Sequence, residues 1–477
     1  MKKPIILLYH PASGAYNYPL SLLAIASLMD RSSYEIQIVD AGIEAAPLTV
    51  VEAYLDNLLC LGVTVVTGRP IADALRVSQF AKERRPELPI IWGGWHPSIF
   101  PDQCLASPYV DIVVAGQGEE TFAEVVQRLT EGRDLDGCQG AIFKKAGQVV
   151  HNAPRPLVDV NRFPPLDFSL LNVARYMEKR GAPVLDFCSS QGCPWRCTFC
   201  SEPLINRRRW TGLDGTRLVA ELAALARRYG FQDVHFMDEL FFVNRKRVRS
   251  FAETLVAADP KLRWRATARA DEIARADDEF LALIRRSGGY HIFVGAESGS
   301  QTILDRIKKD ISVEHIWAAA QKLHRFGFQA TFTFIVGFPH ESPATANETI
   351  DMAKRLRDLD PGFDTPLLFF TPYPGTEEYL ALAQQNIPLP ITLEEWAGRE
   401  FKTTAGAWVS PRLKHTVQSL NFYLPLAYPA RPDRTHPLKT MVWRAARWRV
   451  EHDFYAWPLE RPLQRWYRQL RPTRGRA

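Results

Sequence analysis

The chain has 477 residues, of which 46% are hydrophobic and 23% are charged, and its formal net charge is +6. This size and composition predict two or three domains with their own cores, and they exclude a disordered or fibrous protein. No run of 18 uncharged apolar residues occurs and no signal peptide is recognisable, so we expect neither a membrane-spanning helix nor secretion.

Cysteines and charges are both unevenly distributed along the chain. Three of the seven cysteines fall within residues 193–200, and the odd number favours a reducing cytoplasm over a disulfide framework. Residues 431–477 contain twelve Lys and Arg against four Asp and Glu, while the rest of the chain is close to balance. The basic character is therefore a property of the C-terminal segment.

Residues 1–150 predict a doubly wound α/β domain. Helical patterns at Pro19–Met29, Ile71–Arg84 and Glu119–Thr130 alternate with short runs rich in Ile and Val. The predicted strands are Ile5–Tyr9, Tyr34–Asp40, Leu61–Gly68, Leu88–Gly94 and Asp111–Gly116. Five such strands are typical of a flavodoxin-like (Rossmann-type) parallel sheet, whose ligands lie beyond the carboxyl ends of the strands.

Glycines follow the predicted strands at that edge of the sheet. They are Gly68, Gly93, Gly94, Gly116 and Gly118. Glycines let the backbone approach a large flat ligand, and they also form tight turns between a strand and a helix. Taken alone, these glycines are compatible with a ligand-binding role and with a purely structural role in turns.

The glycines belong to a wider set of motifs that resembles a known domain. Residues 93–97 (GGWHP) and 116–119 (GQGE), with 18–20 (YPL) and 39–41 (VDA), resemble the cobalamin-binding domain fused to many radical S-adenosylmethionine (SAM) enzymes. The resemblance implies that the five glycines contact cobalamin.

One motif of other cobalamin-binding domains is missing. The D-x-H-x-x-G motif supplies a histidine to cobalt, but here Leu8 stands where the aspartate before His10 is needed. His96 fits the motif no better. The chain therefore resembles the subgroup whose cobalt has no protein histidine below it.

Residues 151–181 are interrupted by four prolines and predict an extended linker. Residues 182–375 then alternate strand and helix patterns. The predicted strands are Pro183–Ser189, Asp233–Asp238, Leu262–Ala268, His291–Ala296, Ala330–Val336 and Pro366–Thr371. Six repeats fall short of the eight in a closed barrel, so we expect an open, partial (β/α)6 barrel of TIM type.

Cys193, Cys197 and Cys200 follow the first of these strands with C-x3-C-x2-C spacing. Three thiolates in one short loop can hold an iron–sulfur cluster and leave one iron without a protein ligand, where chemistry can occur. A structural zinc site needs four ligands instead, and Cys188 is near enough in sequence to be the fourth. The spacing alone leaves both alternatives open.

This spacing, with the aromatic Phe199 before the last cysteine, resembles the signature of the radical SAM superfamily. The resemblance implies that the three cysteines hold a catalytic [4Fe-4S] cluster, which binds and reductively cleaves SAM. It implies SAM contacts from Phe199 and from residues at the ends of later strands: Asp238, Glu239, Glu297, Gly337 and Pro339. Asp238 and Glu239 correspond only by position, because the glycines of the family's Gly-Gly-Glu motif are missing.

Two segments of the chain are notably basic. Arg207, Arg208 and Arg209 follow the cluster loop, where they could attract an acidic reductase or an anionic substrate group, or form a solvated turn. Residues 376–477 predict a mainly helical region, in which Leu438–Tyr455 is a basic, Trp-rich amphipathic pattern. Such a helix could contact an anionic membrane surface or pack on the barrel. Nucleic-acid binding is not expected, because no recognised module accompanies the charge.

Together these features predict a cytoplasmic radical SAM enzyme, with peripheral contact at the inner face of the membrane as an option. The resemblance favours cobalamin-dependent methyl transfer to an unactivated carbon of a small molecule, with a flavodoxin- or ferredoxin-type electron donor. Radical oxidative cyclisation or ring rearrangement of a lipid-like or polycyclic substrate is the alternative chemistry. A non-catalytic metal or cobalamin carrier or sensor is the alternative from another class.

Overall fold

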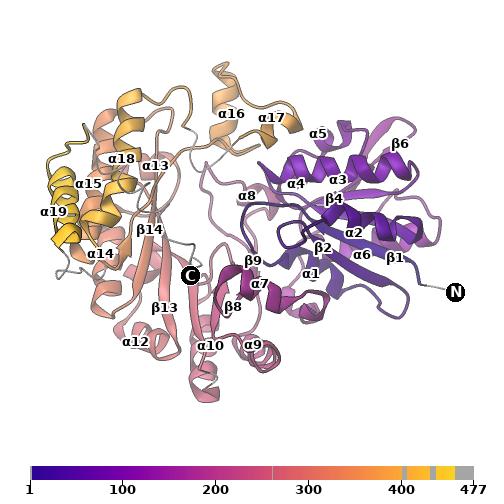
Figure 1. Ribbon diagram of the computed structural model, residues 1–477, viewed down its shortest axis with the longest axis horizontal. Helices are drawn as coiled ribbons and strands as arrows, with labels where there is room; N and C mark the ends of the chain where they lie inside the picture. The colour runs from indigo at the N-terminus through magenta and orange to yellow at the C-terminus, as the bar shows by residue number, and fades with distance from the viewer. Residues whose placement is uncertain (1–2, 260, 400–404, 430–436, 457–477) are drawn as a thin grey trace. The chain divides into compact units, whose positions relative to one another are not determined.

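A computed structural model describes residues 3–259, 261–399, 405–429 and 437–456 of the chain. The packing of the chain divides it into two compact units (Figure 1). The first comprises Met1–Gly230 and Pro372–Glu400, and the second comprises Phe231–Thr371 and Phe401–Ala477. This division is based on packing contacts alone. The domain boundaries expected from the sequence, near residues 150, 181 and 375, stay predictions.

The first unit contains a seven-stranded sheet with the order β2-β1-β3-β4-β5-β6-β7. Its strands are β1 (Ile5–His10), β2 (Glu35–Asp40), β3 (Leu58–Thr64), β4 (Ile90–Gly93), β5 (Ile112–Val114), β6 (Ala141–Lys145) and β7 (Gln148–His151). β1 to β5 are parallel, and β6 and β7 extend the sheet in antiparallel pairing. The order 2-1-3-4-5 confirms the flavodoxin-like prediction. The sequence does not predict β7, because this largely exposed strand lacks a buried apolar run.

Helices cover both faces of this sheet, as buried parallel strands require. α1 (Leu20–Ser27) and α6 (Glu119–Thr130) pack together on one face, where Leu22 and Phe122 join strand residues in a common core. α2 (Pro47–Tyr54) and α3 (Pro70–Arg84) contact each other, and neither helix contributes a residue to that core cluster. They cover the opposite face of the sheet. The short helices α4 (Trp95–Ile99) and α5 (Pro101–Ala106) follow β4.

The remainder of the first unit joins the predicted linker to the cysteine segment. In chain order it forms α7 (Val173–Arg180), β8 (Val184–Phe187), β9 (Ser190–Gly192), α8 (Glu202–Ile205), β10 (Trp210–Gly212) and α9 (Gly215–Tyr229). The sequence does not foresee α7 inside the linker, although Asn172 caps its first turn and Gly181 ends it in the left-handed conformation. α16 (Glu377–Gln384) and α17 (Leu393–Ala397) belong to the returning segment, and α17 packs on α3.

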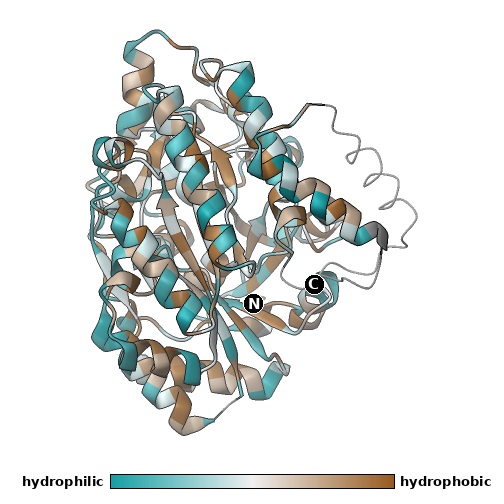
Figure 2. Ribbon diagram, turned by 90° about the vertical axis from the view of Figure 1, so that its left-hand side faces the viewer, coloured by the Kyte–Doolittle hydropathy of each residue, from teal (hydrophilic) through white to brown (hydrophobic). Residues whose placement is uncertain are grey.

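The second unit is built on parallel strands followed by helices. Its strands are β11 (Asp233–Phe236), β12 (Arg263–Arg269), β13 (Gly289–Glu297), β14 (Gln329–Val336), β15 (Phe363–Asp364) and β16 (Leu367–Phe369), with β11 to β14 adjacent in chain order. The intervening helices are α10 (Arg245–Ala258), α11 (Ala270–Ala274), α12 (Asp278–Arg286), α13 (Gln301–Arg306), α14 (Val313–Arg325) and α15 (Pro343–Leu359). Every strand predicted from Asp233 onward is present, and their order is that of an open barrel. Figure 2, which faces the side of the molecule that carries α14 and α15, shows hydrophilic and hydrophobic residues side by side on its helices, as expected where one helix face covers a sheet.

The C-terminal helices α18 (Pro411–Ala427) and α19 (Pro437–Glu451) pack against each other. The indole of Trp443 donates a hydrogen bond of 2.9 Å to the carbonyl of Ala427, and Arg447 lies 3.3 Å from Asp358 on α15. Packing on the barrel unit is therefore the observed arrangement of α19. Contact with a membrane surface stays a prediction, and Trp457 and Trp466 lie outside the described residues. Within the described ranges, no helix is long and apolar enough to cross a membrane.

Candidate active site

The cysteine loop is closed at its base by a short antiparallel hairpin, which we call the cluster hairpin (residues 190–212). β9 and β10 pair through Gln191 with Thr211 and Gly192 with Trp210. Gly192 has φ of +91°, and a Cβ atom there would overlap the carbonyl oxygen of Arg209. Glycine is therefore required at this position, because only a residue without a side chain lets the two ends of the loop approach so closely.

The three cysteines of the loop lie close enough to influence one another. Burial, together with the neighbouring Cys197 and Cys193, raises the pKa of Cys200 to about 12. The C-x3-C-x2-C spacing fits a cubane cluster, whose irons occupy separate corners so that each cysteine can bind a different one. The mutual repulsion of three thiolates is relieved by a cationic metal centre.

Cys188 lies between β8 and β9, before the cysteine loop. Its thiol donates a hydrogen bond of 3.1 Å to the carbonyl of Ser190.

The cysteine loop is also fixed by a residue that lies far away in sequence. The buried hydroxyl of Thr198 donates a hydrogen bond of 2.9 Å to the carboxylate of Glu378 on α16, and the Glu378 amide returns one to the Thr198 carbonyl. Burial and the neighbouring Cys200 raise the pKa of Tyr373 in the same returning segment. Sequence reasoning misses Glu378, because nothing local distinguishes it from any acidic residue in the first turn of a helix.

A buried polar network joins the cluster hairpin to the GQGE motif of the sheet. The Gln191 side chain accepts a hydrogen bond of 2.7 Å from Gln117 and donates one of 2.7 Å to Glu119. Glu119 is only 4% exposed, and burial raises the pKa of its carboxyl. Gln117 also exchanges two hydrogen bonds with the backbone of Val158. The motif therefore holds the hairpin and the linker against the sheet.

The glycines predicted to contact cobalamin differ in their surroundings. Gly94 has φ of +99°, and a Cβ there would come within 2.9 Å of the Val65 carbonyl oxygen, so this glycine is needed for the turn itself. Gly116 has φ of +77°, and a Cβ there would meet nothing within 4 Å. An open glycine at the carboxyl edge of the sheet fits the approach of a large planar ligand.

The remaining cobalamin glycines carry no comparable signal. Gly68 also has a positive φ, of +109°, in the turn after β3. A Cβ at Gly93 or Gly118 would meet only ordinary contacts, near Val114. Their contact with cobalamin stays a prediction.

His96, which follows the glycine pair, is engaged within the protein. Its side chain is fully buried, with Nδ1 3.2 Å from the hydroxyl of Thr67 and Nε2 3.1 Å from the amide oxygen of Gln103. Burial lowers the pKa of His96 to about 4. Both ring nitrogens are therefore engaged in hydrogen bonds within the protein. His96 fits a structural role rather than that of a cobalt ligand.

Phe199 lies in the cluster hairpin, and the other residues predicted to contact SAM lie in the second unit at the ends of its strands. Asp238 and Glu239 follow β11, and Asp238 is 3% exposed. Glu297 ends β13 at an irregularity of the ladder, with φ of +63°. A left-handed conformation in a buried glutamate is strained and marks a candidate functional position.

Glu297 is held by a buried cation, Lys309, that the sequence analysis does not identify. The Lys309 ammonium lies 2.8 Å from the Glu297 carboxylate. The Arg269 guanidinium donates to the carbonyl of Lys309 and pairs with Asp271 at 3.0 Å. Lys309 is only 7% exposed. The chain therefore fixes the Glu297 carboxylate in place before any ligand arrives.

Gly337 is likewise fixed by its neighbours. Its amide donates to the Glu341 carboxylate, and its carbonyl accepts a hydrogen bond of 2.8 Å from the indole of Trp408. Burial raises the pKa of Glu341 to about 7. The turn that carries Gly337 and Pro339 is thus rigid, and the predicted SAM contact of these residues stays a prediction.

Comparison with known proteins agrees with this arrangement. The B12 binding domain family matches residues 12–126, and the radical SAM superfamily matches residues 187–353. An uncharacterized methyltransferase of Pyrococcus horikoshii, PH0819, is 31% identical over 388 residues, covering 80% of this chain and 82% of the relative. An anaerobic magnesium-protoporphyrin IX monomethyl ester cyclase of Synechocystis sp. is 28% identical over 403 residues, covering 81% and 78%.

Two solved structures share the fold along nearly the whole chain. TsrM from Kitasatospora setae, a radical SAM methyltransferase with cobalamin and a [4Fe-4S] cluster bound, has a TM-score of 0.69 at 18% identity and covers 94% of this chain and 99% of its own. OxsB, a cobalamin-dependent SAM radical enzyme, has a TM-score of 0.74 at 17% identity and covers 94% and 71%.

The three-cysteine hairpin beside a doubly wound sheet defines a metalloenzyme whose chemistry begins at an iron–sulfur cluster. The chain belongs to the radical SAM enzymes that carry a B12-binding domain. Its cofactors are a [4Fe-4S] cluster, SAM and cobalamin, and its class is that of the methyltransferases. When bound, these groups supply one-electron cleavage of SAM and methyl transfer.

Proposed function

We propose that this enzyme transfers a methyl group from SAM to an unactivated carbon atom of a small organic substrate. The observation that carries the proposal is the network of Gln117, Gln191 and Glu119, which ties the cluster hairpin to the GQGE motif. Both cofactor-binding elements thus belong to one packed unit. Reactions that need two cofactors at once require such a fixed relation, because reacting groups must be held in a productive geometry.

The residues are assigned as follows. Cys193, Cys197 and Cys200 hold the cluster, and the open glycine Gly116 lies where cobalamin approaches the sheet. Glu297, positioned by Lys309, accepts a hydrogen bond from SAM, and Asp238 contributes a second acidic group. Burial of these side chains excludes water from their charges, which strengthens their interactions with a bound cofactor. A flavodoxin- or ferredoxin-type protein is the proposed electron donor.

The test uses the full chain reconstituted anaerobically with iron, sulfide and hydroxocobalamin. Incubation with a strong reductant and SAM bearing a deuterated methyl group should yield 5′-deoxyadenosine. It should also place the label on a compound in a small-molecule extract of cells that carry the gene. Cys193→Ala, Cys197→Ala and Cys200→Ala should lose both the cluster absorbance and SAM cleavage. Cys188→Ala is the matched control and should retain both, since Cys188 is not part of the C-x3-C-x2-C motif.

A second chemistry is favoured by one observation, the likeness to the Synechocystis cyclase over 81% of this chain. Oxidative cyclisation would consume SAM and remove hydrogen from a compound in the extract without adding the label. That outcome would replace methyl transfer while leaving SAM cleavage in place. Absence of 5′-deoxyadenosine would contradict both reactions.

A further inference from the structure

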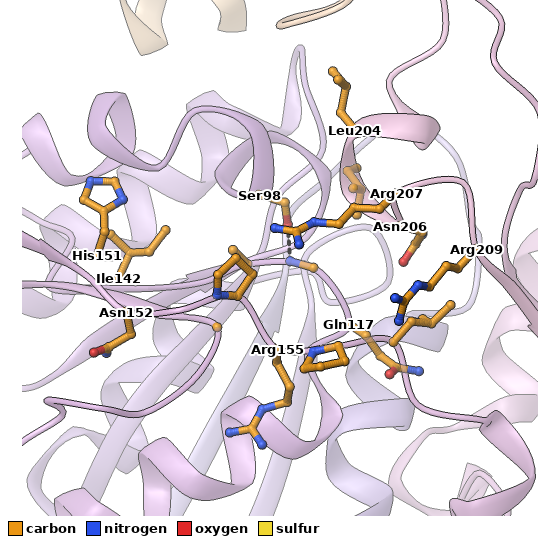
Figure 3. Close-up of a pocket in the computed structure, with 17 residues that line it drawn as sticks. Ser98, Gln117, Ile142, His151, Asn152, Arg155, Leu204, Asn206, Arg207 and Arg209 are labelled. Carbon is orange, nitrogen blue, oxygen red and sulfur yellow. Dashed lines mark hydrogen bonds between the residues drawn. The ribbon is translucent and has the colours of Figure 1, made fainter.

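The first unit contains a cavity of about 450 Å³ whose wall includes Gly116, the glycine assigned to cobalamin (Figure 3). It lies beside the carboxyl end of β5, and its walls come from the β6–β7 hairpin, the linker and the end of the cluster hairpin. The residues that build the walls are Ser98, Gly116, Gln117, Ile142, His151, Asn152, Arg155, Pro156, Leu204, Arg207 and Arg209, among others. Its volume is that of a site for a small organic molecule.

Most of this cavity lies outside the part of the chain that matches the B12 binding domain. That match ends at residue 126, whereas the walls include residues 140–157 and 204–209. Arg207 and Arg209 fall within the radical SAM match instead. The cavity therefore adjoins the cobalamin-binding motif at Gly116 and Gln117 and extends beyond it.

The cavity carries positive charge that the described residues do not neutralise. Arg155 is paired with Glu124, and His151 with Asp102 at 2.7 Å. Arg207 and Arg209 have no ion pair within the described ranges, and both side chains line the cavity. Two free guanidinium groups at one cavity favour a carboxylate or phosphate, which arginine binds in bidentate fashion.

The backbone at these arginines is unusual. Arg207 has φ of +52° and Arg208 has φ of +57°, so two consecutive residues with side chains adopt the left-handed conformation. Such strain persists where the surrounding structure imposes it and is concentrated at ligand-binding positions. Here it coincides with Arg207 lining the cavity, while Arg208 does not line it. Figure 3 shows the Arg207 guanidinium extending toward Ser98 across the cavity.

The rest of the lining is largely apolar. Ile142, Pro154, Pro156, Leu157 and Leu204 form its non-polar walls. A bare inorganic ion would leave these side chains without a partner, whereas an organic anion would cover them with its carbon skeleton. The cavity thus combines a cationic end with an apolar body.

We infer that this cavity binds the phosphate or carboxylate group of the methyl-acceptor substrate, with Arg207 and Arg209 as its anchors. The inference rests on the proposed function and narrows the substrate to small organic anions. Asn206 connects the cavity to the cluster hairpin, because its side chain donates to the buried Glu202 that follows Cys200. Binding of the anion would thus stabilise the segment that carries the cysteines.

The test uses wild-type protein with its cluster in place, before and after loading with hydroxocobalamin, and phenyl phosphate and benzoate as probes. Phenylglyoxal modifies accessible arginines, and peptide mass spectrometry reports each one. Either probe should protect Arg207 and Arg209 at least tenfold and leave Arg208 unprotected. Equal modification of all three arginines with and without both probes would overturn the inference.

Two further arms separate the possible sources of binding. Protection should be the same before and after loading with hydroxocobalamin; if it is complete with cobalamin alone, the cavity belongs to the cofactor and the inference fails. The double variant Arg207→Gln, Arg209→Gln should weaken probe binding at least tenfold, and Arg208→Gln should not change it. Formation of 5′-deoxyadenosine is measured in parallel, so that failure of the proposed function is seen separately from failure of probe binding.

Discussion

At the scale of single residues, the candidate site differs from an ordinary loop because charged side chains at the ends of its strands are buried. Glu297 illustrates this, because its strained backbone and its contact with Lys309 fix a carboxylate that would otherwise be solvated. The buried pair is sensitive to loss of one partner, since an unpaired charge then remains in a region of low dielectric.

Lys309→Met should therefore destabilise the second unit by about 3 kcal/mol. It should also raise the KM for SAM in the 5′-deoxyadenosine assay. The double variant Glu297→Gln, Lys309→Met removes both charges and should regain most of the stability without regaining SAM cleavage. Chemical denaturation measures the first effect, and recovery of cleavage in the double variant would refute the role of Glu297.

Glu341 makes stability depend on pH. Its Oε1 has no hydrogen-bond partner among the described residues, and burial raises its pKa from about 4.5 to about 7. Between these values the unfolded chain releases the proton while the folded chain keeps it. The contribution of Glu341 to the free energy of unfolding is therefore fully present below pH 4.5. It decreases as the pH rises to 7, by at most about 3 kcal/mol.

Glu341→Gln should remove this part of the pH dependence. Urea denaturation at pH 5 and pH 8 should show a smaller difference in the free energy of unfolding than wild type shows. Some dependence should persist, because burial also raises the pKa of Glu272 to about 7. Glu279→Gln is the control, since that side chain is 81% exposed and should leave the wild-type difference unchanged.

At the scale of elements, the cluster hairpin depends on the close approach of its two ends. Gly192→Ala should displace the Arg209 carbonyl and impose an unfavourable φ at the same time. We expect a loss of at least about 2 kcal/mol and a clear fall in bound iron per chain. Iron analysis and thermal denaturation measure the two effects.

Gly230→Ala provides the matched control for that experiment. Gly230 has φ of +71°, but a Cβ there would meet nothing within 4 Å. Its substitution should cost about 1 kcal/mol through backbone strain alone and leave the iron content unchanged. Equal iron loss in both variants would contradict the steric argument.

Much of the architecture was predictable, because each strand of the parallel sheets carries a buried apolar run bounded by turn residues. The three cysteines were predictable for a similar reason, since their spacing is local. The contacts that fix the site were not. Thr198 meets Glu378, and Gln191 meets Glu119, across 180 and 72 positions of sequence. Such pairs leave no periodic or short-range pattern, and they arise only when the fold brings the segments together.

At the scale of the whole molecule, the function depends on the link between the cobalamin-binding sheet and the cluster hairpin. Gln191→Leu should break that link and leave the buried Glu119 without its donor. The expected loss is about 2 kcal/mol of stability. Transfer of the deuterated methyl group should fall more steeply than formation of 5′-deoxyadenosine. The reason is that cleavage of SAM does not require cobalamin to be held in a fixed position relative to the cluster hairpin.

Gln127→Leu on the exposed surface of α6 is the control for this change. Within the described ranges its side chain pairs only with Glu131, and neither activity should change. The ratio of labelled product to 5′-deoxyadenosine is the decisive measurement. An unchanged ratio in Gln191→Leu would mean that the network stabilises the fold without serving methyl transfer.

The bond between Thr198 and Glu378 also has a consequence for biosynthesis. The ribosome must translate the entire run of barrel strands before the residue that clamps the cysteine loop emerges. Nascent chains fold from the N-terminus onward, so the loop remains unclamped during most of translation. A loop fixed by Glu378 is thereby deferred until about four-fifths of the chain has been translated, because 99 residues follow Glu378.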